Sequence, residues 1–410
     1  ILHEIDSVLR SGLSEILNVE LSDIQWSQAS LPVRDGGLGF RCSAMLAPSA
    51  FLASAAGTNE LQSLILPPRL RDLADKLIEA TVKRWQEWSG ADPLEGPTAF
   101  RQRNWDSQCT AKVRRELVER TLDPVERARL LAAQTPHSGD WLQAPPITCV
   151  GLRLENEAIR IAVGLRLGTK LCEPHTCYCK AAVDSRGLHG LSCRSSAGRN
   201  IRHNSVNDII WRAMTKAGVH SVKEPTGLTR EDGKRPDGAS MIPWARGRCI
   251  TWDVTIPDTF APSYLPHTST QAGAAADRAA TLKHSKYQTI KQTHIFIPVA
   301  IETSGVWNDE GLNFMFELGR RLTAITGDQR ETTFLLQRIS ITMQRTNFIS
   351  FNGTFRKYPQ QSNGIPDTHR PFSGPKKVKN KIIAEMFNCS ITSIKRLNKG
   401  YGLQLNQATN

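Results

Sequence analysis

Cysteine and histidine residues gather between positions 172 and 193, in a pattern that suits metal binding. The segment reads Cys172-Glu-Pro-His175-Thr-Cys177-Tyr-Cys179, and His189-Gly-Leu-Ser-Cys193 follows after nine residues. Thiolate and imidazole groups at this density favour tetrahedral zinc over a disulfide framework. We expect the ligands Cys177, Cys179, His189 and Cys193, with Cys172 or His175 as alternatives to Cys177. Four protein ligands leave no open position, so this zinc would be structural.

Two aspartates form a second pattern that could do chemistry. Asp237 follows Lys234-Arg-Pro at the start of one strand-like run, and Asp253 lies sixteen positions later in the run Cys249–Ile256. If the two runs pair as antiparallel strands, both carboxylates reach the same end of the sheet. Hard oxygen ligands suit Mg²⁺, which would polarise a phosphodiester. Asp253 stands between apolar neighbours, where a charge is expensive to bury unless it binds something.

The elements that must position these residues follow from hydrophobic periodicity. We expect helices over Ala44–Ala56, Lys112–Arg120, Pro124–Ala133, Arg202–Ala217, Ala274–Thr289 and Glu310–Met343, the last broken at Gly327. The strand-like runs are Ser221–Glu224, Gly238–Trp244, Cys249–Ile256 and His294–Thr303. This order is that of a mixed α/β unit behind a helical N-terminal region.

The order of these motifs resembles the C-terminal part of non-LTR retrotransposon polyproteins, which carry a PD-(D/E)-x-K, restriction-like endonuclease. That family places a Cys-Cys-His-Cys knuckle before an Arg-His pair, here Arg202-His203. The Pro-Asp motif, the second Asp and a Lys-x-x-Lys-Tyr helix follow, the last being Lys283-His-Ser-Lys286-Tyr287 here. The N-terminal Gln28-Ala-Ser-Leu-Pro and Gly36-Gly-Leu-Gly-Phe40 resemble the thumb region after reverse transcriptase. The resemblance covers most of residues 1–355.

The resemblance implies an α+β fold with a helical N-terminal region, a small zinc knuckle and a PD-(D/E)XK-like mixed sheet flanked by helices. The expected domains are a thumb-like region (1–90), a helical connector (91–165), the knuckle (166–198), the endonuclease (199–355) and a basic, disordered tail (356–410).

The resemblance also implies roles for individual residues. Asp237 and Asp253 would bind Mg²⁺. Thr255 stands where the nuclease pattern has lysine, so Lys283 or Lys286 from the next helix would stabilise charge; a solvated helix face is the alternative. The residues that would contact nucleic acid are Arg202, His203, Lys234 and Arg235, although His203 could instead cap a helix. Glu302 could be a third acid or a polar residue at a strand end.

The charge distribution favours a polyanionic partner. The net charge is +13, but residues 356–399 hold ten Lys/Arg against two acids, so most of the excess lies in the tail. A lysine run, Lys376-Lys-Val-Lys-Asn-Lys381, could be a nuclear import signal or a nucleic-acid clamp. Together with the resemblance, this charge leads us to expect DNA and element RNA as partners and a nuclear location.

Several classes of protein are disfavoured. No run of about 18 apolar residues occurs, so no membrane span is expected. We find no Tyr-x-Asp-Asp-like polymerase motif, and the chain starts without Met. We expect a fragment whose reverse transcriptase domain lies elsewhere. The leading hypothesis is a Mg²⁺-dependent endonuclease that nicks target DNA for target-primed reverse transcription. The alternatives are an inactive, zinc-containing nucleic-acid-binding remnant and a host nuclease of the Holliday-junction or repair type.

Overall fold

The protein has an α+β fold in which helices predominate. The computed structural model describes residues 1–229 and 233–355. The basic tail over 356–410, with its lysine run at 376–381, lies outside the described residues. Within the described part, none of the helices combines the length and the apolar character needed to cross a bilayer.

Helices form the first part of the described chain. They are α1 (Leu2–Leu17), α2 (Asp23–Ala29), α3 (Ser43–Ile65), α4 (Pro68–Ser89), α5 (Gln102–Glu119), α6 (Pro124–Ala133), α7 (Asp140–Gln143) and α8 (Asn156–Leu167). Local chemistry explains several ends. Ser22 and Gln25 form a capping box on α2. Asp123 caps α6, which begins with Pro124. The expected helix over Pro124–Ala133 is confirmed, and those over Ala44–Ala56 and Lys112–Arg120 are parts of the longer α3 and α5.

Strands appear only in the second part of the described chain. A small hairpin pairs β1 (His175–Thr176) with β2 (Ala182–Val183), and α9 (His189–Ser192) and α10 (Gly198–Lys216) follow. The remaining elements are β3 (Ser221–Lys223), β4 (Gly238–Ser240), β5 (Ile250–Thr255), α11 (Leu265–Thr268), α12 (Ala274–Lys286), β6 (Ile295–Ala300), α13 (Asp309–Thr326) and α14 (Glu331–Asn352). The predicted strands are confirmed, although β4 is shorter than expected.

The four longer strands form one mixed sheet in the order β3-β4-β5-β6. The β4–β5 pair is antiparallel, as predicted, and the β5–β6 pair is parallel. A parallel pair needs a crossover, and here α11 and α12 provide it. The predicted break at Gly327 is confirmed, because Gly327 ends α13 in a left-handed conformation with φ +76°.

The main hydrophobic core lies between one face of this sheet and three helices. Ile250, Trp252 and Val254 of β5 join residues of α10, α13 and α14 in a single buried cluster. Because side chains alternate along a strand, Thr251, Asp253 and Thr255 face the other side. The helix α12 packs on β5 and β6 there, through small side chains such as Ala276 and Ala280 that allow a close approach.

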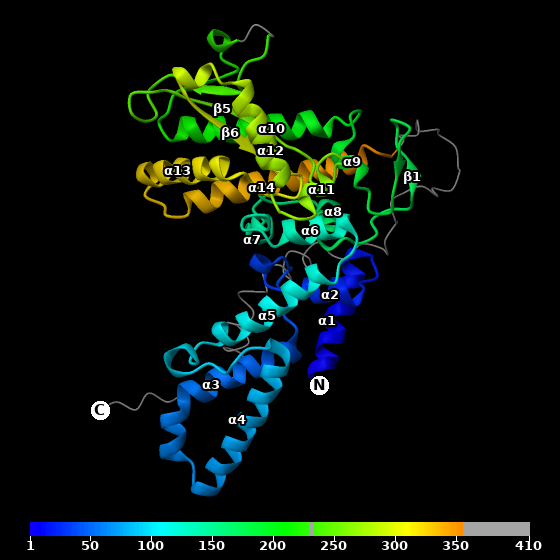
Figure 1. Cartoon of the computed structure of the whole chain (residues 1–410), viewed down its shortest axis with the longest axis vertical. Helices are drawn as coiled ribbons and strands as arrows, with labels where there is room; N and C mark the ends of the chain where they lie inside the picture. Colours follow the sequence, from blue (N-terminus) through cyan, green and yellow to red (C-terminus); the bar gives the residue numbers. More distant parts are fainter. Residues whose placement is uncertain (230–232, 356–410) are drawn as a thin grey trace.

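Figure 1 shows how these parts are arranged along the molecule. The sheet lies at one end with α10, α12, α13 and α14, and the α3–α4 hairpin lies at the other. The helices α6, α7 and α8 lie between them. The long helix α14 contacts α7, α8, α9, α10 and α13, so it links the middle of the molecule to the sheet.

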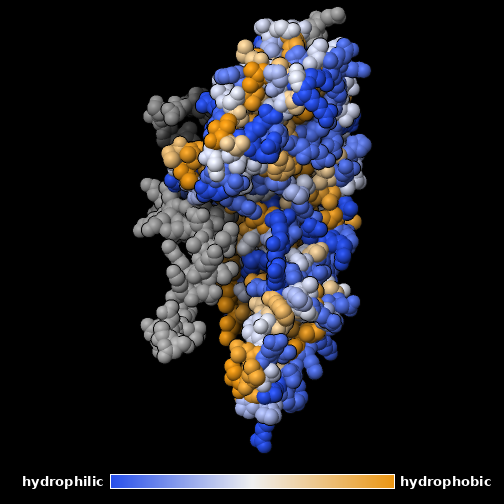
Figure 2. All heavy atoms as spheres, turned by 90° about the vertical axis from the view of Figure 1, so that its left-hand side faces the viewer, coloured by the Kyte–Doolittle hydropathy of each residue, from blue (hydrophilic) through white to orange (hydrophobic). Residues whose placement is uncertain are grey.

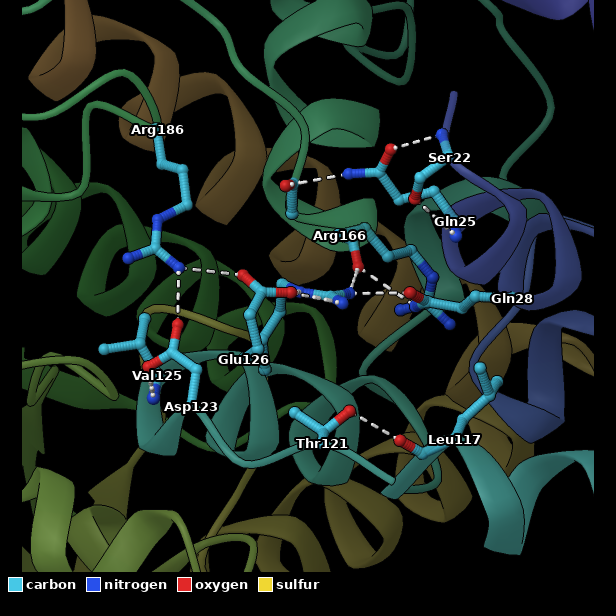
Figure 3. Close-up of polar contacts among 12 residues, drawn as sticks. Ser22, Gln25, Gln28, Leu117, Thr121, Asp123, Val125, Glu126, Arg166 and Arg186 are labelled. Atoms are coloured by element: carbon cyan, nitrogen blue, oxygen red, sulfur yellow. Dashed lines mark hydrogen bonds and ion pairs between the residues drawn. The ribbon is translucent and has the colours of Figure 1, made fainter. Parts of the chain in front are cut away.

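A buried polar network joins the N-terminal helices to the middle of the molecule (Figure 3). The amide of Gln28 in α2 donates to the carbonyl of Arg166 at 3.0 Å and accepts from Arg129 of α6 at 2.7 Å. Arg129 also pairs with Glu126, which in turn accepts from Arg186 at 2.9 Å. Gln28 is 1% exposed. The Gln28 motif thus docks α2 on α6 and α8.

Apolar side chains gather on the exposed end of the α3–α4 hairpin. Figure 2 shows them as orange atoms on the lower part of the molecule. The exposed members are Leu61, Leu64, Ile65, Leu70, Leu73 and Leu77. A contiguous apolar surface of this kind is more typical of an interaction site than of a solvated helix.

Candidate metal centre and active site

Three cysteines and one histidine converge beside the β1–β2 hairpin. Ligand atoms of Cys177, Cys179, His189 and Cys193 all lie within 4.8 Å of one another. The sulfurs of Cys177 and Cys193 are 3.7 Å apart, and the Cys179 sulfur lies 3.1 Å from Nε2 of His189. This group could hold a metal ion, and it is the ligand set expected from the sequence.

The two alternative ligands point elsewhere. The Cys172 thiol lies 3.5 Å from the carbonyl of Asp184, and burial raises its pKa to about 11. His175 is held through Nε2 by the hydroxyl of Thr354 at 3.0 Å and stacks on the ring of Phe355. Cys172 is therefore a buried neutral thiol, and His175 packs against the end of α14.

Close packing against α14 fixes the metal-binding segment in place. A Cβ added to Gly187 would lie 2.2 Å from the Phe351 ring, and one added to Gly198 would lie 2.1 Å from the Ser350 hydroxyl. Such contacts leave room only for glycine. The segment that carries His189 and Cys193 is therefore part of the main fold and not a separate finger.

The register of β4 and β5 brings the two aspartates together. Gly238 pairs with Trp252, so Asp237 and Asp253 flank this pair on neighbouring strands. The Asp237 carboxylate accepts a hydrogen bond from the main-chain N–H of Val254 at 2.6 Å. The expectation that an antiparallel pair would carry both acids to one end of the sheet is confirmed.

Asp253 lies 3% exposed below α12. Burial raises its pKa, as does the negative charge of Asp237, while Lys283 opposes both effects. Lys283 donates a hydrogen bond to one carboxylate oxygen of Asp253, and Nζ of Lys286 lies 3.9 Å from the other. The structure thus places both predicted lysines at the acid pair, although neither belongs to β5.

Asp237 is held by a histidine from α10. Nε2 of His203 lies 2.9 Å from a carboxylate oxygen of Asp237. The hydrogen bond to Asp237 raises the pKa of His203 to about 8, despite the opposing effect of burial. His203 therefore orients an acid and does not cap a helix.

Comparison with known proteins gives no match, either to a protein-family model or to a curated protein sequence. The chemistry of the site is therefore argued from its own residues.

One expectation needs correction, and one open alternative is decided. Arg202 is 1% exposed, and its guanidinium donates to the Ser350 hydroxyl at 2.9 Å and faces the carbonyl of Leu191. It joins α10 to α14 and is not presented to nucleic acid. Glu302 is not a third acid of the site. It is fully buried and accepts hydrogen bonds from the N–H groups of Ala275 and Ala276, at the start of α12.

The other two predicted nucleic-acid residues lie beside the site. Lys234 is exposed on the loop before β4. The side chain of Arg235 pairs with Glu224, while its carbonyl accepts from the Tyr287 hydroxyl at 2.8 Å. The same hydroxyl accepts from Lys286 at 2.7 Å. Tyr287 was part of the predicted lysine motif, but its role in tying α12 to the Pro236–Asp237 turn was not foreseen.

Sequence reasoning missed Asn207. It lies one helical turn after His203, on the same face of α10, and that spacing was the available signal. Its side chain contacts the main chain of Asp237 and the indole of Trp252.

The arrangement combines two converging carboxylates, two lysines and a histidine at one end of the sheet. Carboxylates that repel each other are suited to sharing a divalent cation. The lysines are suited to stabilising negative charge on a phosphate.

Proposed function

We propose that this protein is the DNA endonuclease portion of a non-LTR retrotransposon protein. The observation that carries the proposal is the convergence of Asp237, Asp253 and Lys283 from three different elements. An acid pair at the end of a mixed sheet, with a lysine in reach, suits phosphodiester hydrolysis. The reaction would nick target DNA and so supply the primer for reverse transcription.

The donor set fits Mg²⁺. Asp237 and Asp253 supply hard oxygen ligands, and the pKa of Asp253 is raised partly by Asp237, so a divalent cation would relieve their repulsion. A bound Mg²⁺ would supply Lewis-acid polarisation of the phosphodiester. Lys283, which pairs with Asp253 here, would stabilise negative charge on the scissile phosphate. His203 holds the Asp237 carboxylate in its orientation.

The Cys₃His group fits zinc. Zinc–sulfur bonds of about 2.3 Å in a tetrahedron separate two sulfurs by about 3.8 Å. The Cys177 and Cys193 sulfurs are 3.7 Å apart. The zinc would be structural, because the four ligands fill a tetrahedron. It would hold the knuckle that precedes α10.

The wider proposal concerns partners and location. The nuclease would act in the nucleus on DNA, bind element RNA, and work beside a reverse transcriptase domain. The support is the resemblance of the ordered motifs, together with the exposure of Lys234 next to the acid pair. Phosphate contacts of this kind supply affinity without sequence information.

One observation favours a second candidate function. Both acids are engaged by cationic side chains, Asp253 by Lys283 and Asp237 by His203, and Thr255 replaces the usual lysine. If these ion pairs always keep both carboxylates from binding a metal ion, the protein is an inactive, zinc-containing nucleic-acid-binding remnant.

Nicking of supercoiled plasmid in Mg²⁺ separates the two functions. Zinc-loaded wild type should nick, and Asp237→Ala and Asp253→Ala should each abolish nicking while retaining zinc. Asp72→Asn, an exposed acid of α4, is the matched control and should nick normally. A folded, zinc-loaded wild type that binds DNA without nicking it would establish the remnant instead.

A further inference from the structure

Asn207 bridges the two strands that carry the acid pair. Its side-chain Nδ2 donates to the main-chain carbonyl of Asp237 at 3.2 Å, and its Oδ1 accepts from the indole N–H of Trp252 at 2.8 Å. Asn207 is 7% exposed. A buried amide that satisfies a donor and an acceptor on neighbouring strands fixes their relative position.

Trp252 is the residue immediately before Asp253 and is fully buried in β5. Its ring occupies the space above Gly238, where an added Cβ would lie 2.0 Å from a ring carbon. The Trp252 ring therefore contacts Gly238, the residue after Asp237, while Trp252 itself directly precedes Asp253 in the chain. Asn207 therefore contacts Asp237 directly and Asp253 through its neighbour Trp252.

Other contacts restrain Asp237 as well. Its carbonyl also accepts from the N–H of Glu224 at 3.0 Å, and its carboxylate is held by His203 and by the N–H of Val254. The Glu224 contact comes from the residue after β3, on the far side of β4 from Asp253. The Val254 contact joins Asp237 to β5 through its own carboxylate, whereas the Asn207 bridge joins the Asp237 main chain to β5 through a side chain of α10.

We propose that Asn207 is a positioning residue that sets the separation of Asp237 and Asp253 for binding a divalent cation. The inference rests on the proposed nuclease function and deepens it. Groups behind metal ligands hold the ligands in register, and their loss typically lowers metal affinity by about 10- to 100-fold.

Asn207→Leu tests the bridge, since leucine has nearly the same shape and no polar atoms. It removes the donor to the Asp237 carbonyl and leaves the indole N–H of Trp252 buried without its acceptor. Trp252→Phe removes that N–H but leaves the Asn207–Asp237 contact. The double variant removes both polar partners, which usually restores much of the lost stability. Stability and metal affinity should therefore respond differently across the series.

The readouts are Mn²⁺ binding to the zinc-loaded protein by electron paramagnetic resonance, urea unfolding, and kcat and KM for plasmid nicking. We expect Asn207→Leu to weaken Mn²⁺ binding by about 10-fold or more and to lower kcat, with KM for DNA little changed. Trp252→Phe cuts the bridge at its β5 end, so it should lower stability and also weaken Mn²⁺ binding, but by less than Asn207→Leu because Asn207 still contacts Asp237. The double variant should regain stability and still bind Mn²⁺ as weakly as Asn207→Leu.

Two results would overturn the inference alone. The first is an unchanged Mn²⁺ affinity in Asn207→Leu. The second is recovery of both stability and Mn²⁺ affinity in the double variant, because that recovery would show that Asn207 acts only through packing. A third result separates the failure of the proposed function. If wild type and Asp253→Asn bind Mn²⁺ equally, no cation site exists at the acid pair, and both proposals fall.

Discussion

Lys283 and Asp253 form a hydrogen-bonded ion pair that joins α12 to β5. Asp253 is 3% exposed, so its charge is removed from water and needs this partner. The lysine reaches it because α12 packs on β6 through alanines.

Replacing Lys283 should damage nicking more than replacing Lys286. Lys283 contacts Asp253 directly, whereas Nζ of Lys286 lies 3.9 Å away and also bonds to the Tyr287 hydroxyl. We expect Lys283→Met to slow single-turnover nicking by roughly 10²- to 10³-fold, the usual effect of losing one charge-stabilising donor. Lys286→Met should have a smaller effect.

Circular dichroism and zinc content should match wild type in both lysine variants. Slower nicking would then reflect a loss of catalysis and not a loss of folded protein. Equal losses for Lys283→Met and Lys286→Met would contradict the assignment of the direct contact to Lys283.

Loss of the Cys₃His metal should destabilise the whole sheet-bearing part of the molecule. Gly187 and Gly198, on either side of His189 and Cys193, pack against α14, which also contacts α10 and α13. We expect Cys193→Ser to lose zinc and to lower the unfolding temperature by several degrees, because structural zinc contributes directly to folding. Mass spectrometry of bound metal and calorimetry provide the measurements.

Cys172→Ala is the matched control for the metal group. Cys172 is a buried cysteine of the same segment, but it lies outside the ligand cluster. This variant should keep about one zinc per chain. Loss of zinc from Cys172→Ala would show that Cys172 is a zinc ligand, as in the alternative ligand set.

Glu302 should control the stability of α12. Its carboxylate satisfies the N–H groups of Ala275 and Ala276, which otherwise have no partner within the helix. Glu302→Ala should therefore lower the free energy of unfolding by about 1–3 kcal/mol, and Glu302→Gln by less, because the amide oxygen can still accept. Urea unfolding at fixed pH measures both effects.

The same residue predicts a pH dependence. Burial raises the pKa of Glu302 above its value in the unfolded chain, so the native state binds more protons. The free energy of unfolding should then fall as pH rises above about 4.5, across the interval up to the raised pKa. Glu302→Gln should lack this contribution, so its stability should depend less on pH over that interval than wild type does. If the free energy of unfolding changed equally with pH in wild type and in Glu302→Gln, the raised pKa of Glu302 would be contradicted.

Gly187→Ala should destabilise the protein more than Gly151→Ala. Both glycines have positive φ, +69° and +74°, so both variants bear the same backbone strain. Only at Gly187 does the added methyl meet a ring, that of Phe351; nothing lies within 4 Å at Gly151. Overpacking typically adds about 1–3 kcal/mol. Thermal unfolding of the two variants would measure this difference, and equal losses would argue against tight packing on α14.

The amino-acid sequence alone was sufficient to predict the order of elements and the two chemical clusters. Strand periodicity located β5 and the antiparallel partner that carries Asp237, and close Cys/His spacing located the metal group. These signals are local, because neighbouring residues share a turn or a strand face. The sequence left Cys172 and His175 as alternatives to Cys177, and the structure groups Cys177 with the other three ligands.

Only the tertiary structure decided which groups meet across the fold. Arg202 and Glu302 look like surface and site residues in the sequence, yet one is buried against α14 and the other caps α12. The spacing of Asn207 from His203 places both on one face of α10, but the partners of Asn207 are decided only by the packing of α10 on the sheet. Contacts between distant segments depend on packing and register, and these are properties of the whole core that no short window of sequence contains.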